Sequence, residues 1–291
     1  MRRIEENNFK FFSCCYRYVL QEGFFMKICM MSLMMDECPV NEIVKTALEC
    51  GMEAIDWIGL HGCRAEFLKK VCDDAGLYIA AHTMIKSGFL TDNAGYFDEF
   101  KSSLDDARVM GAPVMMIPPF PRINQTSLED DRRRYIDYYA RCCEYAVGSG
   151  VTLTLESTGY HNSPITTADE CLEVFRQVPD LRLTYDQGNV ATADDPVEAF
   201  MKLRKYVVHF HVKDWYVFDK ANENTTPKRC GKHFADATIG EGDMDIKSFW
   251  QLTTPEERQI FVNPETRDYT GKRNAVDIFK QVCAELQSYE N

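Results

Sequence analysis

Four runs of apolar, strand-forming residues end in side chains that bind divalent cations well. Strands usually give way to turn residues such as glycine, proline or asparagine, so four metal-ligand types in succession are unusual. Three carboxylates and one imidazole, gathered at one edge of a sheet, would form a cage for a single divalent cation. The four runs are Leu153–Glu156, Leu183–Asp186, Val207–His211 and Ile260–Glu265.

This donor set predicts which metal binds and which reaction follows. Oxygen ligands with one imidazole suit Mn²⁺ or Mg²⁺, whereas thiolates would favour zinc. We therefore expect one divalent metal ion, with Mn²⁺ the first choice and Mg²⁺, Co²⁺ or Zn²⁺ the alternatives. Such an ion on the carbonyl and neighbouring hydroxyl of a sugar stabilises the enediolate that forms when an adjacent carbon loses its proton. Glu156 and Glu265 are the candidate bases that remove and return this proton.

Other side chains near strand ends are candidates for substrate contact, and each has a structural alternative. His82 ends an earlier strand and could contact substrate or make a structural hydrogen bond. Trp57 could form an apolar wall against a sugar or pack in the core. Lys213 continues the face of His211 and could contact substrate or lie in solvent. Arg267 could hold a phosphate or carboxylate, or form an ion pair.

The elements that would position these residues alternate along the chain. Apolar runs separated by segments of helical periodicity predict eight strands and no domain linker. A strand, a crossover helix and a further strand imply parallel pairing with right-handed connections. An open doubly wound sheet is the competing architecture, but no Gly-rich GxGxxG segment follows the first strand. We therefore predict an α/β fold, a single-domain (β/α)8 TIM barrel, whose reactive groups gather at the carboxyl ends of the strands.

The predicted barrel begins at Met26 and covers residues 26–291. Residues 1–25 carry basic residues among aromatics but no apolar stretch of signal or membrane-span length, and we expect an N-terminal extension to which we assign no function. The early strands are expected at 28–33, 53–58, 77–82 and 114–117. The helices are expected at 39–50, 65–74, 96–110, 128–147, 167–177, 196–205 and 274–288.

Composition narrows the class of partner. The formal net charge of −12 argues against a nucleic-acid groove and against docking on anionic lipid. The chain has 12 cysteines but no CxxC pair, and several lie in apolar or helical stretches. Free cysteine packs as a small hydrophobic residue, so we expect reduced thiols in a cytoplasmic protein. The expected ligand is a small sugar or sugar derivative, with homo-oligomerisation or a partner subunit left open.

Several segments together resemble a known family. They are Leu155-Glu156, Tyr185-Asp186-Gln187-Gly188-Asn189, His209-Phe210-His211-Val212-Lys213-Asp214 and Gly240-Glu241-Gly242-Asp243. Over roughly residues 26 to 290 the chain resembles the xylose isomerase-like TIM-barrel superfamily, specifically its branch of sugar phosphate isomerases and epimerases. The resemblance implies one divalent metal, often Mn²⁺, on a Glu, an Asp, a His and a second Glu from strands five to eight. Carried over, these ligands are Glu156, Asp186, His211 and Glu265.

Two positions depart from the pattern of some epimerases in that family. Where those enzymes have a histidine three residues after the strand-six Asp, this chain has Asn189. Where they have a further Glu after strand five, this chain has a loop containing His161, the candidate substitute. Both residues are expected to contact substrate. The first hypothesis is a metal-dependent sugar or sugar phosphate isomerase or epimerase. The alternatives are a metal-dependent lyase or dehydratase, including a C-glycoside-cleaving subunit, and a non-catalytic sugar- or partner-binding barrel.

Overall fold

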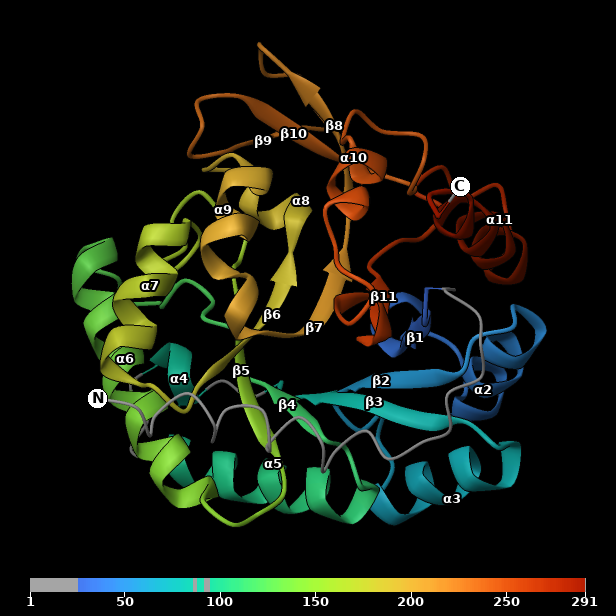
Figure 1. The fold of residues 1–291 in the computed structure, drawn as a ribbon, viewed down its shortest axis with the longest axis horizontal. Coiled ribbons are helices and arrows are strands. Elements are labelled where there is room, and N and C mark those ends of the chain that lie inside the picture. The colour runs from blue at the N-terminus through green and yellow to red at the C-terminus, as the bar shows by residue number, and fades with distance from the viewer. Residues whose placement is uncertain (1–25, 86–87, 92–94, 291) are drawn as a thin grey trace.

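Eight parallel strands form the centre of the molecule. The structure, a computed structural model, describes residues 26–85, 88–91 and 95–290. The strands are β1 (Cys29–Met31), β2 (Ala54–Ile58), β3 (Tyr78–Thr83), β4 (Val114–Met116), β5 (Thr152–Glu156), β6 (Arg182–Asp186), β7 (Val207–Val212) and β11 (Val262–Pro264). They follow this order in one sheet (Figure 1). A parallel bridge between Ile28 and Val262 joins the last strand to the first, so the sheet closes into the predicted (β/α)8 barrel.

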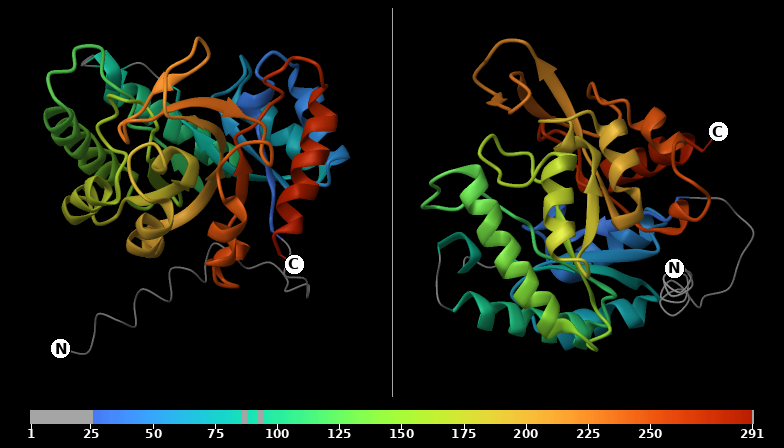
Figure 2. Two further views of the ribbon diagram at one scale, coloured as in Figure 1. Left: turned by 90° about the horizontal axis from the view of Figure 1, so that it is seen from above. Right: turned by 60° about the vertical axis from the view of Figure 1, so that its left-hand side comes forward.

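Helices surround the sheet, and polar caps fix where several of them begin. Ser127 accepts a hydrogen bond from the backbone N–H of Asp130, and Thr167 forms a capping box with Glu170. The helices are α2 (Val40–Glu49), α3 (Ala65–Ala75), α4 (Gly88–Thr91), α5 (Tyr96–Met110), α6 (Leu128–Ala146), α7 (Ala168–Gln177), α8 (Gln187–Val190), α9 (Pro196–Leu203), α10 (Ile246–Gln251) and α11 (Ala275–Ser288), with 3-10 turns η1 (Ser32–Met35), η2 (Arg204–Tyr206) and η3 (Glu257–Gln259). Helix α11 packs beside α2 and so completes the ring (Figure 2).

The connection from β7 to β11 differs from the single crossover helix that the alternation predicts. It contains a second, antiparallel sheet in the order β8 (Asp214–Phe218), β10 (His233–Ala237) and β9 (Thr226–Pro227). Helix α10 follows this sheet and precedes β11. Figure 1 shows the second sheet at the top of the view, projecting from the barrel beyond the ends of β6 and β7. We call residues 214–237 the β8–β10 hairpin.

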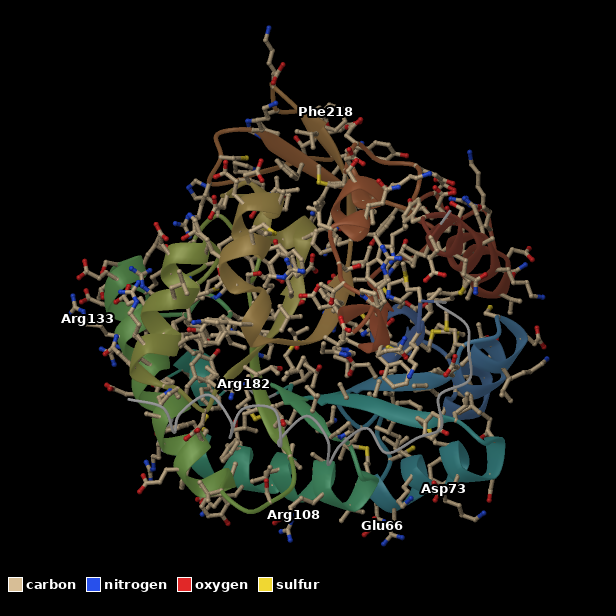
Figure 3. The ribbon with its side chains drawn as sticks, in the orientation of Figure 1. Glu66, Asp73, Arg108, Arg133, Arg182 and Phe218 are labelled. Carbon is tan, nitrogen blue, oxygen red and sulfur yellow. The ribbon has the colours of Figure 1, made fainter. Side chains whose placement is uncertain are left out.

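Apolar side chains of the strands and helices form one large buried cluster between the sheet and its helical ring. Charged residues lie on the outward faces of the helices, as Figure 3 shows for Glu66 and Asp73 on α3, Arg108 on α5 and Arg133 on α6. Among the described residues no helix combines the length and the apolar character that a membrane span requires. This partition of apolar and charged side chains is what a barrel buried on both faces needs.

Every cysteine that the structure describes is a free thiol, and about half of them are buried. This agrees with the expectation of reduced thiols for these positions. Burial raises the pKa of buried thiols such as Cys283, to about 12, so they pack as small apolar groups. Cys14 and Cys15, with the whole of the predicted extension 1–25, lie outside the described residues.

Candidate metal centre

Four side chains meet at the carboxyl ends of β5, β6, β7 and β11. Glu156 and Asp186 are the last residues of β5 and β6, His211 lies one residue before the end of β7, and Glu265 follows β11. Parallel pairing sets Asp186 directly beside His211. One ligand atom from each of the four lies within 4.8 Å of the other three. The fold therefore brings together the four residues that the sequence singled out.

Burial and like charge make this cluster unfavourable without a cation. Burial, together with the charges of Glu265 and Glu156, raises the pKa of Asp186 to about 7. Burial likewise raises the pKa of Glu156. For Glu265 burial acts in the same sense, but the charge and hydrogen bond of Lys213 outweigh it and hold the pKa below its ordinary value. Three crowded carboxylates and an imidazole form a donor set that fits one divalent cation.

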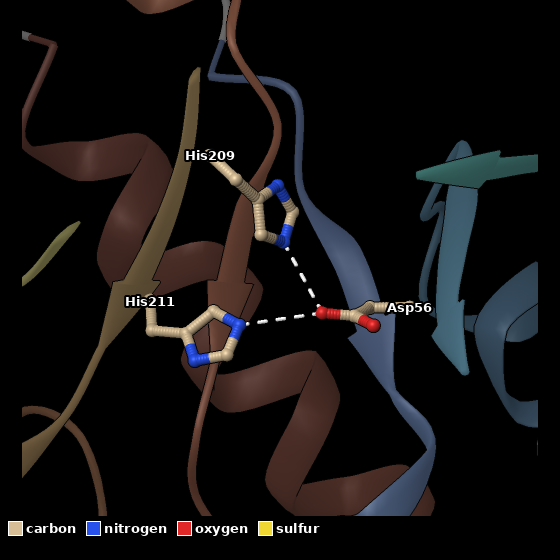
Figure 4. Close-up of side chains that lie close together, drawn as sticks. All are labelled: Asp56, His209 and His211. Atoms are coloured by element: carbon tan, nitrogen blue, oxygen red, sulfur yellow. Dashed lines mark hydrogen bonds and ion pairs between the residues drawn. The ribbon is translucent and has the colours of Figure 1, made fainter. Parts of the chain in front are cut away.

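The imidazole of His211 lies between two carboxylates. Its Nδ1 is 2.7 Å from Oε1 of Glu156, and its Nε2 is 3.3 Å from Oδ2 of Asp56 (Figure 4). The same Oδ2 lies 3.2 Å from Nε2 of His209 and accepts a hydrogen bond from Nδ2 of Asn263 at 2.9 Å. A metal-binding histidine commonly donates its second ring N–H to a carboxylate, which fixes the ring. Nδ1 of His211 thus faces the cluster, and Asp56 stands behind it.

Asp56, His209 and His211 also form a group with metal-ligand spacing. It lies deeper in the barrel than the first group, since His209 precedes His211 by two residues on β7. Burial would raise the pKa of Asp56, but hydrogen bonds from both histidines hold it well below the ordinary value. The two groups share His211, and the rim group offers the larger number of carboxylates. We therefore take the rim group as the candidate metal centre.

Two further sequence candidates contact ligands of the rim group. Asn189 donates its backbone N–H to Oδ1 of Asp186 at 2.9 Å and its side-chain N–H to Oδ2 at 3.0 Å. Lys213 donates to Oε1 of Glu265 at 2.5 Å, and its Nζ lies 4.5 Å from the centre of the Trp215 ring. Both side chains therefore hold a carboxylate of the centre in place, a role that the sequence did not assign to them.

Trp57 and His82 pack rather than reach the rim group. Trp57 follows Asp56 on β2, so strand alternation turns its indole away from the barrel interior, and its ring packs edge-on against His61. The expectation of an apolar wall against a sugar is thereby corrected, because the side chain is fully buried. Nδ1 of His82 lies 3.0 Å from the backbone carbonyl of Trp57. This is the structural hydrogen bond that was expected as the alternative to substrate contact.

His161 and Arg267 are both exposed. His161 lies on the loop after β5 and is not a member of the metal-ligand group formed by the described residues. Arg267 donates to the backbone carbonyl of Leu33 at 3.4 Å, and within the described part of the chain it does not form the ion pair that was its alternative. The charge of Arg267 also lowers the pKa of Glu265. This effect is smaller than that of Lys213, and burial acts in the opposite sense.

Comparison with known proteins agrees with this geometry. A family model described as "Xylose isomerase-like TIM barrel" matches residues 44–284. The chain belongs to this family. No curated protein gives a significant match to the sequence. The xylose isomerase-like assignment therefore rests on the family model and on the fold.

Three solved structures with this xylose isomerase-like fold illustrate the range of its members. The IOLI protein with a bound zinc atom is 16% identical, with 90% of this chain and 96% of that chain covered and a TM-score of 0.71. The 3-keto-D-glucoside 4-epimerase YcjR from E. coli is 15% identical, with 90% and 99% covered and a TM-score of 0.68. The probable 3-DHS dehydratase AsbF from Bacillus anthracis is 19% identical, with 90% and 98% covered and a TM-score of 0.67. At these identities the likeness establishes the fold.

The sequence did not predict the roles of Asp56 and Asn263. Asp56 is the single charged residue in the otherwise apolar run Ala54–Ile58, and a buried acid inside a strand was the available signal. Asn263 lies in β11 two residues before Glu265, so the alternation of an extended chain directs both side chains to the same side. The roles of both residues depend on their contact with His211, which lies on β7, distant in sequence from either of them.

Proposed function

We propose that this chain is a metal-dependent isomerase or epimerase of a sugar or sugar derivative, sugar phosphates included. The observation that carries the proposal is the meeting of Glu156, Asp186, His211 and Glu265 within 4.8 Å. These residues would hold one divalent ion, and the oxygen-rich donor set favours Mn²⁺ or Mg²⁺. The epimerase among the structures with this fold supports the reaction class.

The two glutamates have different environments, and this suggests different roles. When bound, the cation would polarise the sugar carbonyl and acidify the neighbouring C–H. Glu265, paired with Lys213, is held ionised and suits the base that takes the proton. Glu156 has a raised pKa and suits the group that returns a proton. They extend from β5 and β11, which are separated by β6 and β7, so they approach a substrate from two sides.

Metal content tests the centre directly. The purified protein should hold about one divalent ion per chain, measured by elemental analysis. The His211→Ala variant should lose this ion, because it removes the single imidazole ligand. His161→Ala is the matched control, since His161 is exposed and outside the cluster. Full occupancy in the His211→Ala protein would refute the assignment.

Proton transfer can be tested without knowing the product. Ketoses and 3-oxo-glycosides incubated with the enzyme in D2O should exchange a carbon-bound hydrogen for deuterium, followed by NMR. Glu156→Gln and Glu265→Gln keep the size and one oxygen ligand but remove most of the basicity. Each should slow exchange by about 10²- to 10⁴-fold, the range expected for a lost general base. Near-wild-type exchange in both variants would assign the proton transfer to other residues.

A lyase or dehydratase is the second candidate, and the probable 3-DHS dehydratase among the structures with this fold supports it. Elimination needs one base and one proton donor for the leaving group. Glu265 would be the base and Glu156, whose pKa burial raises, the donor. Lys213 is a poor donor because, against the effect of burial, the carboxylates around it raise the pKa of its ammonium well above the ordinary value. The same NMR experiment separates the two reactions. An isomerase or epimerase gives a deuterated isomer, whereas a dehydratase or C-glycoside lyase gives a product that has lost water or its β-substituent.

A further inference from the structure

The β8–β10 hairpin places a second lysine at the mouth of the barrel. Lys228 follows β9 and precedes the turn into β10, and it is only 7% exposed. Its Nζ donates to the backbone carbonyl of Gly159 at 2.7 Å and lies 4.7 Å from the centre of the Trp215 ring. Gly159 belongs to the loop that follows Glu156, so the ammonium is fixed close to the strand end that carries a proposed metal ligand.

No acidic side chain of the described residues pairs with this ammonium. Asp236, the carboxylate whose charge acts on Lys228, forms its ion pair with Lys213 at 3.8 Å, and Glu265 pairs with Lys213 at 2.5 Å. Burial and the charge of Lys213 lower the pKa of Lys228 to about 8, which still leaves it mostly protonated at neutral pH. A buried cation without a counter-charge is unfavourable, and an anionic ligand group would offset that cost.

Contacts on both sides hold the hairpin turn in place. Arg229 makes two hydrogen bonds to the carboxylate of Glu170 on α7, at 2.9 and 2.8 Å. The backbone N–H of Cys230 donates to the carbonyl of Thr192, at 2.8 Å, in the segment after β6. The turn that contains Lys228 is therefore hydrogen-bonded to the barrel through its two following residues. The position of the Lys228 ammonium is set by this backbone as well as by its own side-chain contacts.

We propose that Lys228 and Lys213, which both lie against the Trp215 ring, form a subsite for an anionic group on the substrate, either a carboxylate or a phosphate. The inference rests on the proposed function, because it extends the substrate from the metal centre toward the hairpin. Lys213 links the two parts, since its ammonium contacts Glu265 and the same indole that Lys228 contacts. The substrate class is then an acidic sugar or a sugar phosphate, because a neutral sugar would leave Lys228 without a counter-charge.

Binding of three four-carbon polyols tests this subsite: neutral erythritol, erythronate with its carboxylate, and erythritol 4-phosphate. Calorimetry on the full chain, with and without Mn²⁺, should give one or both anions an affinity about tenfold or more above that of erythritol. Lys228→Gln keeps an amide that can donate to Gly159 but removes the charge, and it should abolish the preference. Lys232→Gln is the matched control, since Lys232 lies in the same hairpin, is exposed and pairs with Asp219 at 3.7 Å.

Equal affinities of the wild-type protein for all three ligands would overturn the inference, and this comparison needs no variant. An anion preference that survives in both Lys228→Gln and Lys228→Met would also overturn it. The tighter of the two anions identifies carboxylate or phosphate as the group recognised. Metal analysis of the same samples separates this inference from the proposed function. A protein that holds one ion per chain without anion preference refutes the subsite alone, whereas anion preference in a protein that binds no ion refutes the metal centre alone.

Discussion

Asp56 lies behind the candidate metal centre and contacts it only through His211. Its Oδ2 is shared by two histidines and by the amide of Asn263, while its Oδ1 has no hydrogen-bond partner among the residues that the structure describes. An acid held ionised at this depth keeps the proton of the His211 ring on Nε2 and leaves Nδ1 free to bind a cation. Asp56 therefore acts as a positioning residue for His211.

We predict that Asp56→Asn weakens metal binding by about 10- to 100-fold, the usual effect of losing such a partner. The variant keeps the size of the side chain but not its charge, so the His211 ring loses its orientation. The metal dissociation constant, measured by competition with a chelating dye, and the visible spectrum of the Co²⁺-loaded protein should both change. Asp73→Asn, on the exposed face of α3, should change neither. An unaltered spectrum and affinity in Asp56→Asn would mean that His211 is oriented without Asp56.

The four rim residues could be predicted from the sequence because each ends a strand, and a barrel brings strand ends together. Lys213 was placed near the centre because it continues the face of His211, and Asn189 because of the resemblance to the family, both as substrate contacts. Lys228 could not be predicted this way. It belongs to the β8–β10 hairpin, and its surroundings come from loops after β5 and β6 that are distant in sequence.

At the scale of elements, Asp214 fixes the base of the β8–β10 hairpin. Its carboxylate accepts hydrogen bonds of 2.9 to 3.1 Å from the backbone N–H groups of Trp215, Gly240, Gly242 and Met244. The Gly240–Asp243 segment wraps around this carboxylate. A Cβ on Gly242 would lie 2.2 Å from Oδ1 of Asp214, so only glycine fits there. The hairpin leaves the barrel at a defined angle because its base is tied to this loop.

Asp214→Asn should therefore loosen the hairpin. The amide NH2 would face backbone N–H groups, and at least one buried donor would lose its acceptor at a cost of about 1–3 kcal/mol. For a chain of this size the melting temperature should fall by roughly 2–4 °C per kcal/mol. Asp219→Asn, at the exposed end of the same hairpin, should leave it unchanged. A melting temperature equal to that of the wild type would show that the base of the hairpin does not need the Asp214 charge.

Local patterns predicted the regular elements well and the hairpin poorly. The expected helix at 96–110 coincides with α5, and β5 and β6 end at Glu156 and Asp186 as predicted. Periodicity and Gly111 at the C-terminal cap predicted the helix, and the apolar runs predicted the two strands. Strands β8, β9 and β10 and helix α10 were missed, β8 because it continues from β7 with only Lys213 between them. Strand β8 begins at Asp214, whose carboxylate accepts hydrogen bonds from the segment 240–244. Contacts between residues this far apart in sequence produce no local sequence pattern.

At the scale of the whole molecule, closing the barrel concentrates buried acids at one end. Asp186 and Glu156 are buried together with Glu265 nearby, and the surrounding dipoles do not fully compensate them. The folded chain therefore carries an electrostatic cost that the unfolded chain does not. Binding of one divalent cation would remove this cost, so metal binding and folding should be coupled.

The coupling predicts how the stability of the metal-free protein depends on pH. The pKa of Asp186 is about 7 in the folded chain, against an ordinary value of 3.8. Between these values the folded chain binds more protons than the unfolded chain, so the contribution of Asp186 falls as the pH rises from about 4 to about 7. The melting temperature of metal-free wild type should therefore drop between pH 5 and pH 8 relative to that of Asp186→Asn, whose amide does not ionise. Titrating groups far from the rim are common to both proteins and cancel in this difference, whereas Glu156 and Glu265 interact with Asp186, so the difference reports the three carboxylates together. Adding Mn²⁺ at pH 8 should raise the wild-type melting temperature far more than that of the variant. A difference that stays constant with pH would mean that Asp186 is already ionised and compensated in the metal-free fold, leaving no electrostatic reason for a cation at the rim.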